Sequence, residues 1–227
     1  DTVAVYPTSN AFEADLLAVI AGATGPQTLK VASVQALAVN ANGGNDALQL
    51  WGTQANNTFA MTDGTGRVDS GPTVSFSGIE SVVLAGLGGT DDQVYNGASA
   101  AYTLDASGAN PTLSNGALTV TLITLERLVL NGNAAADALT VIGTAADETY
   151  DVTSTAPNQA RMTTALGGLD VRAETFSGYV LQGGAGGFDQ VNLNGTNGND
   201  TVTSNLVAVT LNGVAVNVAT GVDRLEI

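Results

Sequence analysis

Short apolar segments alternate along this chain with turns rich in glycine, asparagine and aspartate. Some apolar segments precede an acidic turn, at residues 37–39, 82–84, 128–130 and 179–181. Others follow it, at residues 47–50, 93–95, 138–141 and 190–193. The glycines and Asn-Gly pairs of the turns supply backbone conformations with positive φ, which close tight connections between strands. Short apolar segments between such turns predict an all-β fold.

The acidic turn recurs at a regular interval. Its acids are Asp46, Asp91 with Asp92, Asp137 and Asp189, each surrounded by glycine, asparagine or alanine. The step from Asp46 to Asp91 is 45 residues, that from Asp92 to Asp137 is also 45, and that from Asp137 to Asp189 is 52. A period of this size is typical of solenoids and tandem arrays. We therefore expect a β-solenoid whose acidic Gly/Asn turns stack along one edge.

A second architecture fits the same pattern. Residues 113–118 and 209–214 each place an Asn-Gly pair between two apolar segments. This arrangement is a strong local signal for a β-hairpin, in which the two strands are antiparallel. A tandem array of small antiparallel β-domains is therefore the alternative to a solenoid.

The repeat also divides the chain. A divergent N-terminal part-repeat or cap occupies residues 1–35, and the repeats follow at 36–80, 81–126, 127–178 and 179–227. Two interpretations of the first segment are open. Residues 10–13 have the spacing of a helix capping box, and Phe12, Leu16 and Ile20 share one helical face. The same residues also alternate as they would in a strand.

Composition narrows the range of functions. The 21 acidic residues against 6 basic ones give a net charge of −15. This charge disfavours nucleic acid and anionic membrane surfaces as partners, because contacts to phosphate need clusters of Lys and Arg. The chain has no cysteine and no histidine, so the commonest general base and the usual zinc ligands are missing. We expect no enzymatic activity, no nucleic-acid binding and no insertion into a membrane.

Two segments carry a resemblance to a known family. Residues 42–48 (Asn-Gly-Gly-Asn-Asp-Ala-Leu) and 195–202 (Gly-Thr-Asn-Gly-Asn-Asp-Thr-Val) resemble the haemolysin-type (RTX) repeat, Gly-Gly-x-Gly-x-Asp-x-apolar-x. The chain is also similar to the Gly/Asp/Asn-rich repeats of large bacterial surface and biofilm proteins. In the RTX family, turn carbonyls and the Asp carboxylate hold Ca²⁺ between stacked coils.

The resemblance implies calcium sites in the turns. It places the candidate metal ligands at Asp46, Asp91, Asp92, Asp137, Asp189, Asn199 and Asp200. The alternative is that these residues only shape the turns, because Asp and Asn side chains hydrogen-bond to their own backbone.

A second acidic position recurs at the end of the repeat. It holds Glu80, Glu126 and Asp223, whereas the third repeat, around Ser177, lacks the acid. Arg127 and Arg224 follow two of these acids. Cation ligands between coils and a solvated face with weak surface ion pairs both fit the pattern.

Three functions from different classes follow from these observations. The first is a structural subunit of an extracellular bacterial assembly, stabilised by calcium. Its first residues, 1–3, match 200–202 and its last, 222–227, match 125–130, so we expect copies to associate end to end. The second is a calcium-dependent adhesin or carbohydrate-binding stalk, with a cell-surface or matrix polysaccharide as partner. The third, a β-helix polysaccharide-active enzyme, is disfavoured because the basic residues are scattered.

Overall fold

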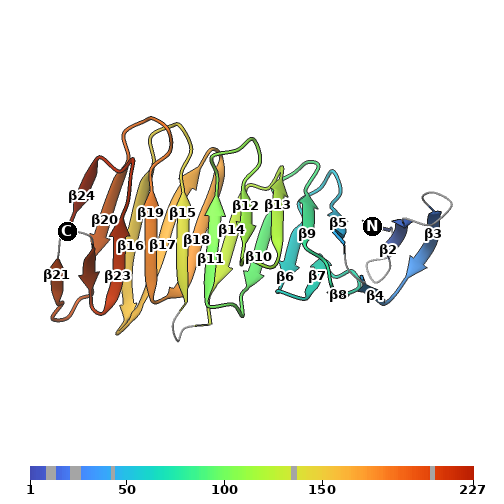
Figure 1. The fold of residues 1–227 in the computed structure, drawn as a ribbon, viewed down its shortest axis with the longest axis horizontal. Coiled ribbons are helices and arrows are strands. Elements are labelled where there is room, and N and C mark those ends of the chain that lie inside the picture. The colour runs from blue at the N-terminus through green and yellow to red at the C-terminus, as the bar shows by residue number, and fades with distance from the viewer. Residues whose placement is uncertain (9–13, 21–26, 42–43, 134–136, 205–207) are drawn as a thin grey trace. The chain divides into compact units, whose positions relative to one another are not determined.

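The protein is built entirely of β-strands in the part of the chain that the structure describes. The structure is a computed structural model, and it describes residues 1–8, 14–20, 27–41, 44–133, 137–204 and 208–227. Stacked parallel strands form a β-solenoid of about 5 turns (Figure 1). The predicted fold class is therefore confirmed. Among the described residues, no helix is long and apolar enough to cross a membrane.

The chain divides into two compact units. Unit 1 comprises Asp1–Tyr95 and Gly116–Glu126. Its strands in the first sheet, sheet A, lie in the order β13 (Thr119–Ile123), β9 (Ser81–Ala85), β5 (Ala47–Trp51), β1 (Thr2–Pro7), β2 (Ala14–Ile20) and β3 (Gln27–Val34). Those in the second sheet, sheet B, lie in the order β10 (Asp92–Asn96), β6 (Thr58–Met61), β7 (Thr65–Val68), β8 (Val74–Ser77) and β4 (Leu37–Asn40).

Unit 2 comprises Asn96–Asn115 and Arg127–Ile227. Its sheet A strands lie in the order β21 (Val202–Ser204), β22 (Val209–Leu211), β23 (Val214–Val218), β19 (Gly178–Gln182), β15 (Ala138–Ile142), β11 (Ala101–Asp105) and β12 (Thr112–Ser114). Its sheet B strands lie in the order β24 (Arg224–Glu226), β20 (Gln190–Asn194), β16 (Thr149–Ala156), β17 (Gln159–Leu166), β18 (Leu169–Phe176) and β14 (Arg127–Asn131).

One sequence repeat is not one turn of the solenoid. In unit 1, the antiparallel meander β1–β3 lies in sheet A, and the single strands β4 and β5 follow in sheets B and A. The next meander, β6–β8, lies in sheet B and is followed by β9 in A and β10 in B. Each repeat thus contributes one meander and two single strands, and these three elements are placed alternately in the two sheets. Because three is an odd number, successive repeats begin in opposite sheets.

The acidic turns consequently alternate between the two edges of the solenoid. Asp46 lies in a connection from sheet B to sheet A, whereas Asp91 lies in a connection from A to B. In unit 2, Asp137 and Asp189 show the same alternation. The expectation that these turns stack along one edge is therefore wrong. One sequence repeat contains one meander and two single strands, which is three stacking elements. One coil of the solenoid needs only two such elements, one in each sheet, so the two periods differ.

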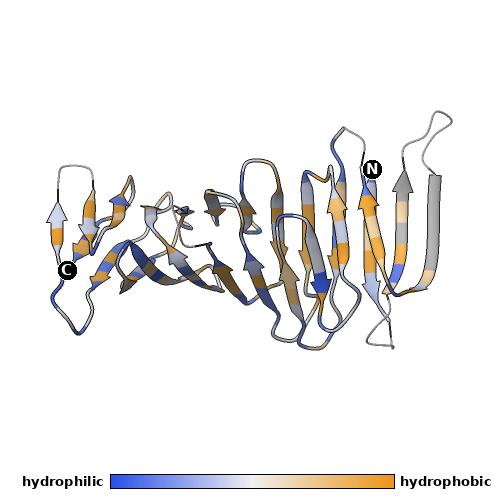
Figure 2. Cartoon of the chain, turned by 90° about the horizontal axis from the view of Figure 1, so that it is seen from below, coloured by the Kyte–Doolittle hydropathy of each residue, from blue (hydrophilic) through white to orange (hydrophobic). Residues whose placement is uncertain are grey.

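The core lies between the two sheets. Parallel neighbours are in register, with Leu48 beside Val82 and Leu50 beside Leu84, all buried. Buried and partly exposed residues alternate along strands such as β5, so that one side chain in two points inward. Apolar residues recur along the strands of both sheets (Figure 2). Tyr and Phe rings are among the largest fully buried side chains, and Tyr179 Oη donates a hydrogen bond to the Ala160 carbonyl at 2.8 Å.

The N-terminal segment is a strand where the structure describes it. Residues Ala14–Ile20 form β2, which pairs antiparallel with β1 and with β3. The helical interpretation is therefore wrong for these residues, and the strand interpretation is confirmed. Residues 10–13 of the expected capping box lie outside the described residues.

The hairpin signal of the alternative architecture also has a place in the fold. β22 and β23 form an antiparallel hairpin whose turn residues, Asn212 and Gly213, both have positive φ, at 51° and 87°. An Asn-Gly turn of this kind matches the twist of the strands that it joins. The local prediction is correct, but the hairpin is part of a solenoid coil and not a separate domain.

Candidate functional site

The repeated turn acids point inward. The exposed fractions of Asp46, Asp91, Asp137 and Asp189 are 4%, 0%, 3% and 0%. Buried carboxylates are costly unless donors surround them. The four acids that recur in the sequence thus share a buried environment in the structure.

Three of the four turn acids, Asp46, Asp91 and Asp189, are held to the next coil by a reciprocal pair of hydrogen bonds, which we call the bracket. In unit 1, the N–H of Asp91 donates to Oε2 of Glu126 at 2.6 Å, and the N–H of Glu126 donates to the Asp91 carbonyl at 3.0 Å. Asp46 and Glu80 form the same bracket at 2.9 and 3.3 Å. In unit 2, the bracket joins Asp189 to Asp223 at 2.9 and 2.8 Å.

The bracket explains the second recurring acid. Glu80, Glu126 and Asp223 accept backbone N–H groups across the stack, a role that neither sequence interpretation had included. In the third repeat, Ser177 occupies this place. Its N–H and its hydroxyl both donate to the Asp137 carbonyl at 3.0 Å. Arg224, which follows Asp223 in the sequence, forms an ion pair with Glu226.

The turn carboxylates themselves accept further N–H groups. Oδ1 of Asp91 accepts from the N–H of Asn57 at 2.7 Å, and Oδ1 of Asp189 accepts from the N–H of Glu148 at 2.9 Å. Oδ1 of Asp46 accepts from the amino group of Asp1 at 2.6 Å, and a carboxylate oxygen of Asp137 accepts from the N–H of Asn133. The Asp137 contact lies within one turn, whereas the other three join residues of neighbouring coils.

Glycine is required beside these carboxylates. A Cβ on Gly86 would lie 2.1 Å from Oδ2 of Asp91 and 2.4 Å from the Thr124 carbonyl oxygen. A Cβ on Gly183 would lie 2.2 Å from both Oδ2 of Asp189 and the Gly221 carbonyl oxygen. The glycine thus allows the backbone to approach the buried acid closely.

Two buried carboxylate oxygens have no hydrogen-bond partner among the described residues: Oδ2 of Asp91 and Oδ2 of Asp189. Burial raises the pKa of Asp91, and the Glu126 carboxylate raises it further, against the lowering by the Asn57 N–H. Burial also raises the pKa of Glu148, and the adjacent Asp189 carboxylate adds to the effect. Neutralisation of these oxygens, by a proton or by a cation, would stabilise each turn.

A complete metal cage is not visible in the part of the chain that the structure describes. No group of three or more His, Cys, Asp or Glu side chains there is arranged to hold a metal ion. Oxygen atoms available to a cation are the two unpartnered Oδ2 atoms and nearby turn carbonyls. Asn42, Gly43 and residues 134–136, which belong to predicted turns, lie outside the described residues.

The other predicted ligands lie apart from the buried turn acids. Asp92 begins β10 with a half-exposed side chain, so Asp91, not Asp92, is the equivalent of Asp46. Asn199 and Asp200 are exposed. Oδ1 of Asp200 accepts from the Thr196 N–H at 2.9 Å and from the Asn212 amide at 2.7 Å, and these bonds lower the pKa of Asp200.

Asn57 and Glu148 were missed as site residues. Each is buried and directs its own N–H to the turn acid of the next coil. Each side chain also accepts the N–H of a threonine, Thr53 at 2.7 Å and Thr144 at 3.1 Å. The signal was present in the sequence, because both follow a Gly-Thr pair at the same spacing.

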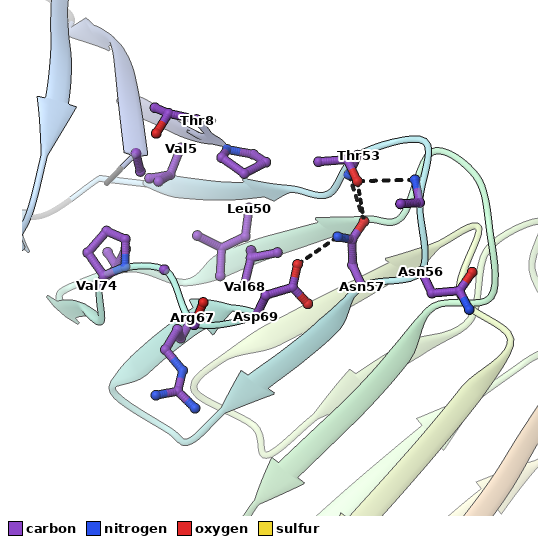
Figure 3. Close-up of a pocket in the computed structure, with 16 residues that line it drawn as sticks. Val5, Thr8, Leu50, Thr53, Asn56, Asn57, Arg67, Val68, Asp69 and Val74 are labelled. Atoms are coloured by element: carbon purple, nitrogen blue, oxygen red, sulfur yellow. Dashed lines mark hydrogen bonds between the residues drawn. The ribbon is translucent and has the colours of Figure 1, made fainter. Parts of the chain in front are cut away.

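Unit 1 also contains a cavity of about 300 Å³ (Figure 3). Val5, Leu50, Val68 and Val74 are among the residues that line it. At its polar end, Asp69 accepts hydrogen bonds from the Asn57 amide and the Thr58 N–H, both at 2.7 Å.

The cavity carries little chemistry of its own. The Arg67 side chain points away from it (Figure 3). The Asn57 amide spans the polar end, because its Oδ1 accepts from the Thr53 N–H while its Nδ2 donates to Asp69. Because Asn57, Thr53 and Asp69 already hydrogen-bond to one another, the main surface that faces the cavity is aliphatic.

Comparison of the chain with protein-family models, with curated proteins and with solved structures found no match. The site must therefore be interpreted from its own geometry.

Proposed function

We propose that the protein is a non-catalytic structural subunit of an extracellular bacterial assembly, such as a filament, an S-layer or a matrix fibre. The observation that carries this proposal is the bracket. The buried turn acids and the second recurring acids, which are the most chemically distinctive residues of the repeat, together join one coil to the next. Repeated internal stacking contacts suit a scaffold, because every coil offers the same contacts to its neighbours.

Association end to end is part of the proposal. β24 is the outermost strand of sheet B in unit 2, and it pairs with β20 along one side. Leu225, in register with the buried Val191, is 37% exposed. An edge strand with an uncovered core position is a template for another strand. That strand could come from a second copy or from further residues of a longer chain.

Calcium is proposed as a stabilising ion. The RTX-like turns, the net charge of −15 and the two buried unpartnered oxygens of Asp91 and Asp189 support it. Ca²⁺ accepts irregular sets of carboxylate and carbonyl oxygens, and it would neutralise the charge that burial makes costly.

Electron microscopy of the purified protein at high concentration, with calcium and with EDTA, tests the proposal. We expect rods that lengthen with concentration. Leu225→Lys should shorten them, because a lysine on an edge strand opposes strand pairing. Leu87→Lys is the matched control, since Leu87 is 44% exposed on a turn. Protein that stays monomeric at high concentration in both conditions would contradict the assembly role.

A further inference from the structure

The outer face of sheet A in unit 1 carries no charge across four neighbouring strands. The sequences of β1, β5, β9 and β13 contain no Asp, Glu, Lys or Arg. Gln49, Val83 and Thr121 form one outward row in register across three of these strands. In a second row, Trp51 and Ile123 end their strands on either side of the buried Ala85, and Tyr6 stacks on Trp51. We call this surface the uncharged face.

Outside these four strands the protein is strongly charged, with a net charge of −15, and the exposed Asp15 of the adjoining strand β2 is paired in register with Tyr6. In unit 1, sheet B exposes Arg67 and holds Asp92 at the start of β10. In unit 2, sheet B carries Asp170, Arg172 and Glu174 on the single strand β18. A strongly acidic chain that keeps four adjacent strands free of charge presents a surface suited to an uncharged partner.

Aromatic rings distinguish the uncharged face from an ordinary sheet surface. Most described Tyr and Phe rings lie in the core, yet Tyr6 and Trp51 are half-exposed on this face. Their ring centroids are 5.8 Å apart and their planes are inclined by 20°. The indole N–H of Trp51 donates to Oε1 of Gln49 at 3.3 Å, which fixes the orientation of the ring.

We infer that the uncharged face binds a neutral polysaccharide chain. The C–H faces of a sugar ring are apolar and pack on aromatic and aliphatic side chains, here Trp51, Tyr6 and Val83. Sugar hydroxyls exchange hydrogen bonds with amide and hydroxyl side chains, here Gln49 and Thr121. A neutral chain meets no repulsion from the acidic protein, whereas a polyuronate does. This activity goes beyond the scaffold role and does not depend on end-to-end association.

Trp51 provides the measurement, because it is the only Trp in the chain. The intact protein is titrated with dextran, mannan and hydroxyethylcellulose as neutral polymers, and with polygalacturonate as an anionic one. We expect a saturable change in the fluorescence of Trp51 with at least one neutral polymer and none with polygalacturonate. Affinity electrophoresis on the same polymers should retard the protein in parallel.

The chain offers a matched pair of variants. Val83→Glu places a charge in the uncharged face and should weaken binding about tenfold, a change of about 1.4 kcal/mol. Val94→Glu places the same charge on the outer side of β10 in sheet B, where the valine is also half-exposed, and should leave binding unchanged. Circular dichroism melts check that both variants are folded. If Val83→Glu is unfolded, Thr121→Glu replaces it in the test.

Three outcomes would overturn the inference. The first is no fluorescence change with any of the three neutral polymers. The second is equal binding by the Val83 and Val94 variants. The third is a change in Trp51 fluorescence with protein concentration alone, together with a dimer in sedimentation, which would show that a second copy covers the face.

Discussion

The backbone N–H of Glu148 donates a hydrogen bond to Oδ1 of Asp189 at 2.9 Å, across 41 residues of sequence. Asn57 and Asp91 make the same contact in unit 1 at 2.7 Å, across 34 residues. One site therefore pairs two buried carboxyl groups, and the other pairs a carboxyl with an amide. Comparing the two sites therefore shows the effect of the additional buried acid, Glu148, which Asn57 replaces in unit 1.

Glu148→Gln should stabilise the protein at neutral pH. Burial raises the pKa of Glu148, so its protonated form is favoured more in the folded state than in the unfolded state. The resulting stability is fully present below the ordinary pKa of glutamate and is lost as pH rises through the raised folded pKa. Glutamine is neutral throughout and can donate to Asp189.

We expect this variant to gain about 1 kcal/mol at pH 7, roughly 2–4 °C in Tm, and to match the wild type near pH 4. Thermal melts across this pH range check the difference. Asp170→Asn, on the exposed side of β18, is the control and should show no such pH dependence. A Glu148→Gln variant less stable than the wild type at pH 7 would refute the assignment.

Asp91→Ala should destabilise the protein by about 1–3 kcal/mol, because it leaves the N–H of Asn57 buried without an acceptor. Asp91→Asn keeps an acceptor oxygen at this place and should cost less. Asp92→Ala, one residue away with a half-exposed side chain, should cost less than Asp91→Ala. Urea denaturation of the three variants gives the ranking, and equal losses at positions 91 and 92 would contradict a stabilising contact between Asp91 Oδ1 and the Asn57 N–H.

Gly86→Ala should be destabilising by about 1–3 kcal/mol, because the new Cβ would lie 2.1 Å from Oδ2 of Asp91. Gly108→Ala is the control, since the nearest atom to its Cβ would be 3.8 Å away. The double variant Gly86→Ala, Asp91→Ala should lose less than the sum of the single variants, because the clash with the carboxylate disappears while that with the Thr124 carbonyl oxygen remains. Additive losses would show that the two residues do not share a contact.

Calcium should raise the melting temperature. At a free concentration about 100 times the dissociation constant, one site adds about 2.7 kcal/mol. The double variant Asp91→Asn, Asp189→Asn replaces both unpartnered oxygens and should abolish the response, whereas Asp170→Asn should retain it. Wild-type melting curves that superimpose in calcium and in EDTA would count against a calcium site.

Local features of the fold were predictable from the sequence. Short apolar segments between glycine- and asparagine-rich turns predicted strands, and the Asn-Gly pair at Asn212 predicted a hairpin that the structure contains. The regular return of Asp46, Asp91, Asp137 and Asp189 predicted a solenoid. These features depend on neighbouring residues and on turn conformations, so they can be recognised without knowing which strands pair.

Only the tertiary structure shows how the repeats are arranged in the two sheets. The sequence could not show that successive repeats begin in opposite sheets, because parallel and antiparallel strands have the same period of two. It could not show which of Asp91 and Asp92 is buried, because the two are adjacent in one turn. The orientation in which β10 enters sheet B determines that Asp91 points inward. The bracket of Asp91 with Glu126 and the stacking of Tyr6 on Trp51 join residues far apart in the chain. Such pairings are set by strand register across the whole stack, which no local pattern encodes.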